Sequence, residues 1–433
     1  MVSHDLMSKN GRILVLVSAF LGWLFAGVQL AVTSLVMRDA MQSMSVGESD
    51  AGEASIGQWM GWLVAAFLFG GAVGGYLFGW LGDKFGRQKA MSASIACYSL
   101  FAFVTYFTQT PDQLLWLRFA TGLGVGGMWP NAIALVSEAW PNFSRPFIAG
   151  IIGTAANVGI MLFSLLTMNV LITPDAWRWT TLLCTSPILL SIFILLAVPE
   201  SPKWLSLKQQ PDKDGADESE TDISESQGNS ELSPLLEIFS SRLIQMTMVG
   251  IVLGTIPLFG GWGSSNWANF WVDQEGVSEA SKAEALFARS LPGSIGSLLG
   301  GALAMLIGRR VSYFLLSFAC LICSQYIFIY SHPQNSDFMI WYAALGLFSG
   351  FFFGWLPFCL PELFPTRVRS TGAGVSFNFG RIVTVVGILV AAGMLKEMLN
   401  GDYAQIGRIT SWIYAIGMVV AFFIPKPQED LER

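Results

Sequence analysis

The stretch Gly79–Ala90, GWLGDKFGRQKA, places four charged residues between two long apolar runs. Asp83 is its acid, and Lys84, Arg87 and Lys89 are its cations. Charged side chains are costly inside hydrocarbon, so a short charged segment between two apolar runs is expected at a membrane surface. The stretch therefore predicts a hairpin that joins two membrane-spanning segments.

The composition of the whole chain is that of a membrane protein. Hydrophobic residues make up 53% of the 433 residues and charged residues 12%, with a mean hydropathy of +0.54. A helix needs about 20 apolar residues to cross a hydrocarbon core of about 30 Å, and runs of that length are too long for barrel strands. The sequence thus predicts an all-α membrane protein with twelve transmembrane helices, near residues 13–36, 58–80, 88–108, 114–138, 147–171, 179–198, 245–271, 286–307, 311–331, 339–361, 371–394 and 407–425.

The charged hairpin has a degraded copy about 222 residues later in the chain. Gly308, Arg309 and Arg310 follow its apolar run, and Met305 stands where the first copy has its acid. Because the acid is missing from the second copy, we expect the two hairpins to act unequally.

A second pattern repeats at nearly the same offset. The spacing E-x-x-P-x-x-x-R runs from Glu138 to Arg145 and again from Glu362 to Arg369. Two homologous halves with a site between them are typical of secondary transporters. The repeats therefore predict two pseudo-symmetric six-helix bundles.

The composition changes abruptly between these halves. Residues 206–235 are acidic and polar, which is typical of a solvated tether. We expect an N-terminal bundle at 1–205, a cytoplasmic acidic linker at 206–240 and a C-terminal bundle at 241–433.

The distribution of basic residues predicts the orientation. With both termini in the cytoplasm, about 16 of them fall on the inner side, which is the positive-inside pattern. We expect a multi-pass protein of a bacterial inner or plasma membrane. The cations assigned to outer loops are Arg38, Arg178, Lys282, Arg289, Lys396 and Arg408.

Four motifs, in order along essentially the whole chain, resemble those of the major facilitator superfamily. Gly79–Arg87 is similar to the signature between helices two and three, and Arg118–Gly126 to a helix-four motif. Pro199–Leu205, PESPKWL, and Pro361–Thr366, PELFPT, resemble motifs of the sugar-porter branch and its organic-ion relatives. The resemblance implies the twelve-helix fold of that superfamily and transport by alternating access.

The charged residues of these motifs are candidates for conformational gates. Salt bridges between helix ends would hold the cytoplasmic side closed and break when it opens, and Asp83 would sit at the N-terminus of helix eleven, where the dipole favours an anion. The alternative is a row of ordinary snorkelling charges. Arg118 lies near the outer end of its helix and could instead serve as a snorkelling or capping residue. The candidates are Asp83, Arg87, Arg118, Glu138, Arg145, Glu200, Arg309, Glu362 and Arg369.

Arg381 is the leading substrate-binding candidate because it falls near the centre of helix eleven. No Asp or Glu falls near the centre of any predicted span, so an anionic substrate could be its partner, bound through a bidentate guanidinium–carboxylate pair. The sequence Asn378-Phe379-Gly380-Arg381 also resembles helix eleven of organic-acid and sialic-acid carriers. The alternative is structural support, with the guanidinium facing a carbonyl or water.

Polar and aromatic residues on other helices could complete the pocket. Helix seven carries a run of glycines, which permits bending or close backbone approach. The candidates, beside Arg381, are Asn378, Gln29, Asn131, Asn157, Trp262, Asn266 and Asn269.

One departure from the relatives concerns ion coupling. Aromatic-acid proton symporters of the superfamily carry an acidic D-G-x-D motif in helix one, and this chain has Ala26–Gln29, AGVQ, instead. Its histidines, His4 and His332, lie outside the predicted spans. Proton coupling would then run through helix-end carboxylates or the substrate, and facilitated diffusion or anion exchange becomes more plausible.

Three functional classes follow. The first is a carrier for a small organic anion, a carboxylate or acidic sugar; a neutral-sugar carrier is the second, and a non-transporting sensor on a carrier fold is the remote third. No nucleotide loop or catalytic triad is readable, so no enzyme is expected, and the acidic linker argues against nucleic-acid binding. The cysteines fall inside spans and are interpreted as packing residues, so no metal or other cofactor is expected. The expected partners are the substrate, the lipid bilayer and a coupling proton or counter-anion, with a single chain as the functional unit.

Overall fold

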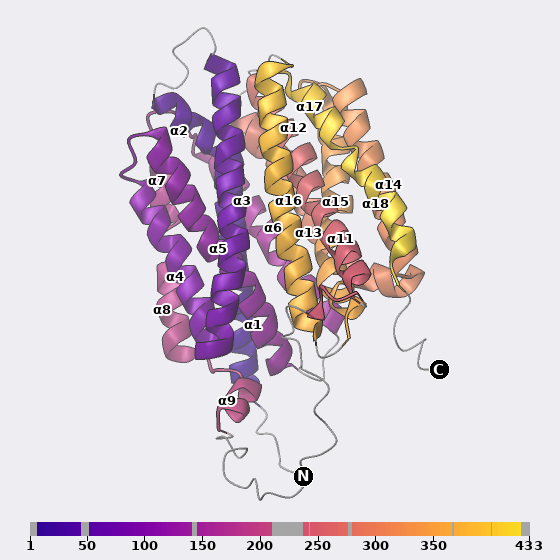
Figure 1. Cartoon of the computed structure of the whole chain (residues 1–433). Coiled ribbons are helices and arrows are strands. Elements are labelled where there is room, and N and C mark those ends of the chain that lie inside the picture. The colour runs from indigo at the N-terminus through magenta and orange to yellow at the C-terminus, as the bar shows by residue number, and fades with distance from the viewer. Residues whose placement is uncertain are drawn as a thin grey trace, which may run out of the picture.

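The structure, a computed structural model, is a bundle of long helices (Figure 1). It describes residues 7–44, 52–140, 145–209, 237–241, 243–275, 279–365, 368–399 and 401–425. Within these ranges it describes the backbone alone at 52–54, 145–146, 149, 207–209, 262–263, 279–280, 369–370 and 395–397.

Twelve helical passes account for the described residues, six in each half of the chain. The passes of the first half are α1 (Lys9–Leu35), α3 (Gly52–Phe85), α4 (Arg87–Thr105), α5 (Pro111–Ala139), α6 (Arg145–Asn169) and the pair α7 (Trp179–Leu183) and α8 (Ile188–Ala197). Those of the second half are α11 (Ile244–Gly260), continued by η2 (Gly261–Asn266) and α12 (Trp267–Gln274), then α13 (Glu279–Ile307), α14 (Arg309–Tyr330), α15 (Ser336–Cys359), α16 (Arg369–Glu397) and the pair α17 (Tyr403–Thr410) and α18 (Ile413–Val420). Two short 3₁₀ segments are η3 (Pro361–Leu363) and η5 (Ala421–Phe423).

Eleven of these passes are long and apolar enough to cross a membrane. The remaining pass is α4, whose first turn carries Arg87 and Lys89 and whose body is rich in serine. The predicted twelve-helix fold is confirmed.

Two short helices mark the opposite ends of the bundle. α2 (Met37–Ser43) follows α1 at one end, and α9 (Pro202–Gln209) follows α8 at the other (Figure 1). We call these the α2 end and the α9 end. The charged hairpin of Asp83 lies at the α9 end, between α3 and α4.

A glycine with positive φ breaks the helix at each repeated hairpin. Gly86, with φ of 115°, separates α3 from α4, and Gly308, with φ of 85°, separates α13 from α14. A residue with a Cβ rarely adopts this conformation. The repeated glycines therefore give the same sharp turn at the equivalent place in both halves.

Glycines also bring helices close in equivalent pairs. A Cβ on Gly126 of α5 would overlap the carbonyl of Gly71 on α3, and a Cβ on Gly350 of α15 would overlap the carbonyl of Gly293 on α13. Small residues permit such backbone approach in membrane helices. α3 with α5 and α13 with α15 are therefore the tightly packed pairs of the two halves.

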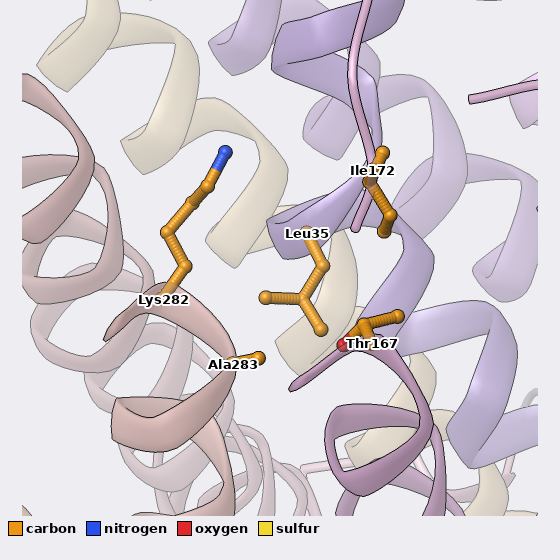
Figure 2. A pocket seen from close by; sticks show the side chains of 5 residues that line it. All are labelled: Leu35, Thr167, Ile172, Lys282 and Ala283. Carbon is orange, nitrogen blue, oxygen red and sulfur yellow. The ribbon is translucent and has the colours of Figure 1, made fainter. Parts of the chain in front are cut away.

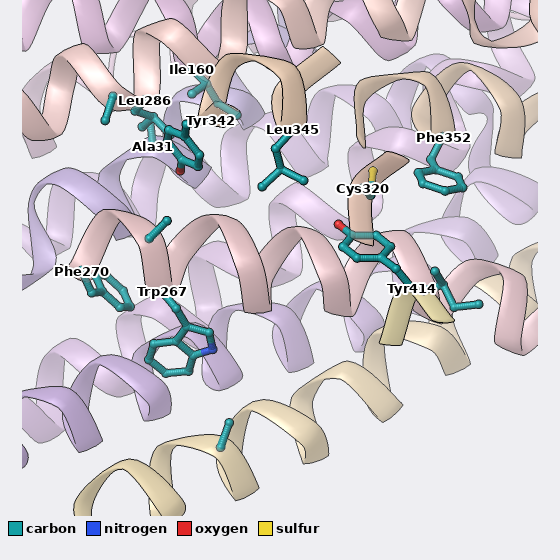
Figure 3. Close-up of a cluster of buried hydrophobic side chains, with 14 of the residues drawn as sticks. Ala31, Ile160, Trp267, Phe270, Leu286, Cys320, Tyr342, Leu345, Phe352 and Tyr414 are labelled. Carbon is teal, nitrogen blue, oxygen red and sulfur yellow. The ribbon is translucent and has the colours of Figure 1, made fainter. Parts of the chain in front are cut away.

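Two seams join the halves. α3 packs against α16 along one seam, and α6 packs against α13 along the other. Figure 3 shows that buried side chains of the first half, such as Ala31 and Ile160, lie in one cluster with Trp267 and Tyr342 of the second half. The core thus continues across the interface between the halves, where a transporter places its site.

Candidate functional site

Arg381 lies on the seam between α16 and α3. Its side chain is buried, with 8% of the residue exposed, and its Nη1 donates to the carbonyl oxygen of Gly71 at 2.9 Å. The guanidinium also lies over the ring of Phe377, 4.9 Å from its centroid. None of the ion pairs among the described residues includes Arg381. A guanidinium has five N–H donors, and this hydrogen bond uses one of them, so donors remain for a bidentate bond to an anion.

Asn378 shares this seam, one turn before Arg381. Its Nδ2 donates to the carbonyl of Gly374 at 3.1 Å, and its Oδ1 is buried without a partner among the described residues. A Cβ on Gly75 of α3 would lie 2.8 Å from that oxygen. The structure thus brings Arg381 and Asn378 together against one face of α3.

Asn157 lies on the other seam. Its Nδ2 donates to Ser297 Oγ at 3.0 Å and to the carbonyl of Gly293 at 3.4 Å, both on α13. One turn away, Thr154 Oγ1 donates to the carbonyl of Ser294 at 3.3 Å. Polar contacts therefore cross both seams.

The candidates on helix seven surround a local break in its geometry. The predicted glycine-rich deviation is the π-helical segment η2, a feature that often marks functional sites. Asn266 accepts from Ser34 Oγ of α1 at 2.6 Å, whereas Asn269 accepts from the hydroxyl of Tyr342 on α15 at 3.1 Å. Trp262 belongs to η2, but its side chain lies outside the described part of the chain.

Arg118 is buried within the first half. Its Nη2 donates to the carbonyl of Gln29 at 3.1 Å and to Thr33 Oγ1, and its guanidinium lies over the ring of Phe67 at 4.4 Å. It thereby ties α5 to α1 and α3. The snorkelling alternative does not fit, because only 3% of the residue is exposed. Gln29 is also buried, and its backbone carbonyl oxygen accepts hydrogen bonds from Arg118 and Thr33.

Asn131 lies between α5 and α3, and its described bonds stay within the first half. Its Nδ2 donates to the carbonyls of Phe78 at 2.8 Å and Gly127 at 2.9 Å, so it packs α5 against α3. Its role in substrate binding stays a prediction.

The gate candidates of the first half pair locally at the α9 end. Arg87 pairs with Asp83 of the preceding turn, and the Asp83 side chain is 70% exposed. Such exposure does not fit the expected position against a helix N-terminus. Glu138 accepts from Ser201 Oγ rather than from Arg87.

The remaining described gate candidates also bond within their own half. Glu200 accepts from the backbone N–H of Gln88 at 3.1 Å and of Ser201 at 2.8 Å, which ties α9 to the start of α4. Arg309 pairs with Glu362 at the α9 end of the second half. The side chains of Arg145 and Arg369 lie outside the part of the chain that the structure describes.

A cluster of charges that the sequence did not predict joins the halves at the α2 end. Arg38 Nε lies 2.7 Å from Asp273 Oδ2, and Lys282 Nζ lies 3.3 Å from Asp39 Oδ2 and 3.0 Å from Asp273 Oδ1. We call these residues the four-charge cluster. Their side chains are only 5–15% exposed. The expectation that Arg38 and Lys282 are outer-loop cations is wrong in this respect, because each is buried against an acid of the opposite half.

The cluster adjoins a small crevice between the halves (Figure 2). Its walls come from α1, α6 and the segment after α6 in the first half, and from α13 in the second half. The lining residues are Leu35, Thr167, Ile172, Lys282 and Ala283. At this end, therefore, only a narrow space remains between the ion pairs and the apolar core.

Arg289 was also misassigned from the sequence. It was counted with the outer loops, but it lies inside α13, ten residues after the helix begins at Glu279. Its Nε is buried without a partner among the described residues. The signal was present in the sequence, since the predicted span 286–307 already contains Arg289.

Comparison with known proteins accounts for this architecture. Residues 13–388 match the family described as the Major Facilitator Superfamily. The chain belongs to this superfamily. Its members are transporters rather than enzymes, and their site lies between the two halves.

Relatives named as transport proteins match over most of the length of this chain. The cis,cis-muconate transport protein of Acinetobacter baylyi is 25% identical over 420 residues, 96% of this chain and 95% of that protein. The benzoate transport protein of the same species is 25% identical over 392 residues, 84% of this chain and 81% of that protein. Among solved structures, a D-xylose–proton symporter superposes with a TM-score of 0.70 at 18% identity, covering 96% of this chain and 97% of that one. The structural likeness concerns the fold alone.

Proposed function

We propose that this chain is a secondary transporter that moves a small organic anion across the membrane by alternating access. The observation that carries the proposal is Arg381, a buried guanidinium at the interface of the halves whose described hydrogen bond is to one backbone carbonyl. A charged group in a membrane interior is costly and is retained where it has a function. A carboxylate would neutralise it and use its forked donors.

The names of the relatives support this substrate class. The muconate and benzoate transport proteins are named for carboxylates, and a niacin transporter of Acinetobacter baylyi is 24% identical over 419 residues. In our proposal Asn378 assists Arg381. Asn157 and Asn266 bond to residues of the opposite half, and Asn269 bonds to Tyr342 of its own half. In our proposal these side chains contact the uncharged part of the substrate.

We assign the α9 end to the cytoplasm of a bacterial cell, with both termini on that side, because most basic residues fall there. The proposed domain boundaries are 1–205, 206–240 and 241–433. One chain contains both halves of the pathway, which supports a monomeric unit. A proton or a counter-anion would provide coupling.

The ion pairs suggest which end is closed. The four-charge cluster bridges the halves at the α2 end, whereas the described carboxylate contacts at the α9 end stay within one half. We propose that this conformation is closed toward the outside. In the alternate conformation the four-charge cluster separates, and the charged motifs at the α9 end form bonds between the halves.

The test is ligand-induced thermal stabilisation of the purified carrier. A ligand that binds only the folded state stabilises it by RT ln(1 + [L]/Kd), so benzoate and niacin are compared with benzamide and nicotinamide, their neutral amides. Acids are expected to stabilise the parent and not Arg381→Gln, with Arg408→Gln, an exposed arginine on α17, as the matched control. Equal stabilisation of the parent and Arg381→Gln by an acid would refute the assigned role.

A neutral-sugar carrier is the second candidate. The likeness to the D-xylose–proton symporter and the Pro199–Leu205 motif favour it. Stabilisation by xylose or glucose, with none by the acids, would move the assignment to this class and leave Arg381 a structural role.

A further inference from the structure

Arg289 is a half-buried arginine of α13 in the second half, and it has fewer partners than Arg381 and Arg118. Arg381 donates to a carbonyl, and Arg118 donates to a carbonyl and a hydroxyl. For Arg289 neither a hydrogen bond nor an ion pair occurs among the described residues, and its Nε is buried. A guanidinium carries five N–H donors and cannot lose its charge. Its buried Nε therefore lacks an acceptor among the described residues.

Arg289 shares a face of α13 with two residues that contact the first half. Arg289, Gly293 and Ser297 are four residues apart, so they follow one face of α13. Gly293 and Ser297 accept hydrogen bonds from Asn157 of the first half. At about 1.5 Å of rise per residue, Arg289 lies roughly 15 Å into α13 from the α2 end. It is therefore well inside the bundle, one turn above the contact with Asn157.

Two other buried donors without acceptors are linked to Arg289 through Tyr342. Tyr342 of α15 interacts electrostatically with it, and the Tyr342 hydroxyl donates to the carbonyl of Ser265 at 2.7 Å and to Asn269 Oδ1 at 3.1 Å. Because Asn269 Oδ1 accepts this bond, the Nδ2 of the same amide points away from the Tyr342 hydroxyl. Asn269 Nδ2 and Ser265 Oγ are both buried without partners in the described part of the chain.

We propose that Arg289, with Asn269 and Ser265, binds a second carboxylate, so that this carrier prefers dicarboxylates to monocarboxylates. The inference rests on the proposed organic-anion transport. One carboxylate neutralises one guanidinium. Arg381 lies at the seam of α3 and α16, and Arg289 lies on α13, a helix of the other seam, so a substrate with two negative charges would satisfy both. Hydrogen bonds from these donors to an anion are charge-assisted and therefore stronger than bonds between neutral groups.

The test compares acids that differ in one carboxylate only. trans,trans-Muconate is paired with sorbate, in which one carboxylate is replaced by methyl, and terephthalate is paired with 4-methylbenzoate. Their Kd values are measured at pH 7.5 by calorimetry with the purified full-length chain. A charge-assisted contact corresponds to about a tenfold to hundredfold change in Kd, so the parent is expected to bind at least one diacid tighter than its partner by that factor.

The variants separate this subsite from the primary site. Arg289→Gln is expected to lower diacid affinity to the monoacid level and to leave monoacid affinity unchanged, while Arg381→Gln weakens both. Arg289→Lys, which keeps the charge but loses the fork, is expected to retain part of the preference and serves if Arg289→Gln does not fold. Arg408→Gln is the matched surface control.

Each outcome decides the matter. A diacid preference that Arg289→Gln abolishes supports the subsite. A parent that binds monoacids as tightly as diacids, or a preference that Arg289→Gln and Arg289→Lys leave intact, overturns it while organic-anion transport stands. Absence of binding by every acid refutes the proposed function and this inference with it.

Discussion

Replacing Lys282 with alanine is expected to open the α2 end of the transporter. Lys282 Nζ contacts Asp39 at 3.3 Å and Asp273 at 3.0 Å, and the three side chains are 5–15% exposed. Removing one partner of a buried ion pair typically costs about 3–5 kcal/mol, because the other charge stays buried without it. Asp273 keeps Arg38 at 2.7 Å, so the lower end, about 3 kcal/mol, is the expected loss.

This loss applies only to the closed conformation, because the carboxylates regain water when the halves separate. At about 1.4 kcal/mol per factor of ten, the equilibrium shifts roughly a hundredfold toward a conformation open at the α2 end. The shift is measured by pulsed electron spin resonance between labels at Gln109→Cys and Arg408→Cys. Both sites are exposed and belong to different halves. Cys97, which is less buried than the other cysteines, is first replaced by alanine.

The expected result is a longer distance between the labels in Lys282→Ala. Lys282→Arg preserves the charge and is expected to keep the short distance. Glu284→Gln removes an exposed charge from the same helix and is expected to do the same. A distance distribution in Lys282→Ala equal to that of the parent would refute the gating role of the four-charge cluster.

Three further predictions concern stability and are measured by thermal unfolding in detergent. Gly126→Ala would force its methyl group into the carbonyl of Gly71, and the overpacking is expected to cost about 1–3 kcal/mol; an unchanged Tm would show that α3 and α5 are not in close contact. Glu200→Gln weakens the hydrogen bond from the backbone N–H of Gln88 at the start of α4 and is expected to lower the free energy of unfolding by about 1 kcal/mol. A more stable variant would contradict the structure. Tyr313→Phe removes a hydroxyl that donates to a carbonyl of α11 at 2.7 Å and is expected to cost about 1 kcal/mol, with transport retained.

The helices were predictable from the sequence because each is a long apolar run in a solvent without water. The hairpin glycines were predictable as a repeat, and Gly86 and Gly308 both adopt positive φ. Arg381 and Asn378 were identified by their place in the middle of helix eleven, and the structure sets both against α3. Signals within one helix were therefore sufficient for the fold and for part of the candidate site.

Contacts between helices were not predictable in the same way. Lys282 and Arg289 stand near the start of a span, where hydropathy does not distinguish a loop cation from a buried one. The burial of Lys282 depends on which helix packs opposite, and its partner Asp39 lies more than a hundred positions away in the chain. Asn131 shows the reverse, since a polar residue inside a span here bonds to backbone carbonyls of its own half.

The central claim is that this chain transports an organic anion and that a guanidinium between the halves, that of Arg381, binds the anion. It is tested most directly by uptake of radiolabelled benzoate and muconate into proteoliposomes that contain the purified chain. We predict saturable uptake of at least one of these acids by the parent, at least tenfold slower uptake by Arg381→Gln, and none of labelled xylose by either. Uptake of xylose with none of the acids, or equal acid uptake by the parent and Arg381→Gln, would contradict it.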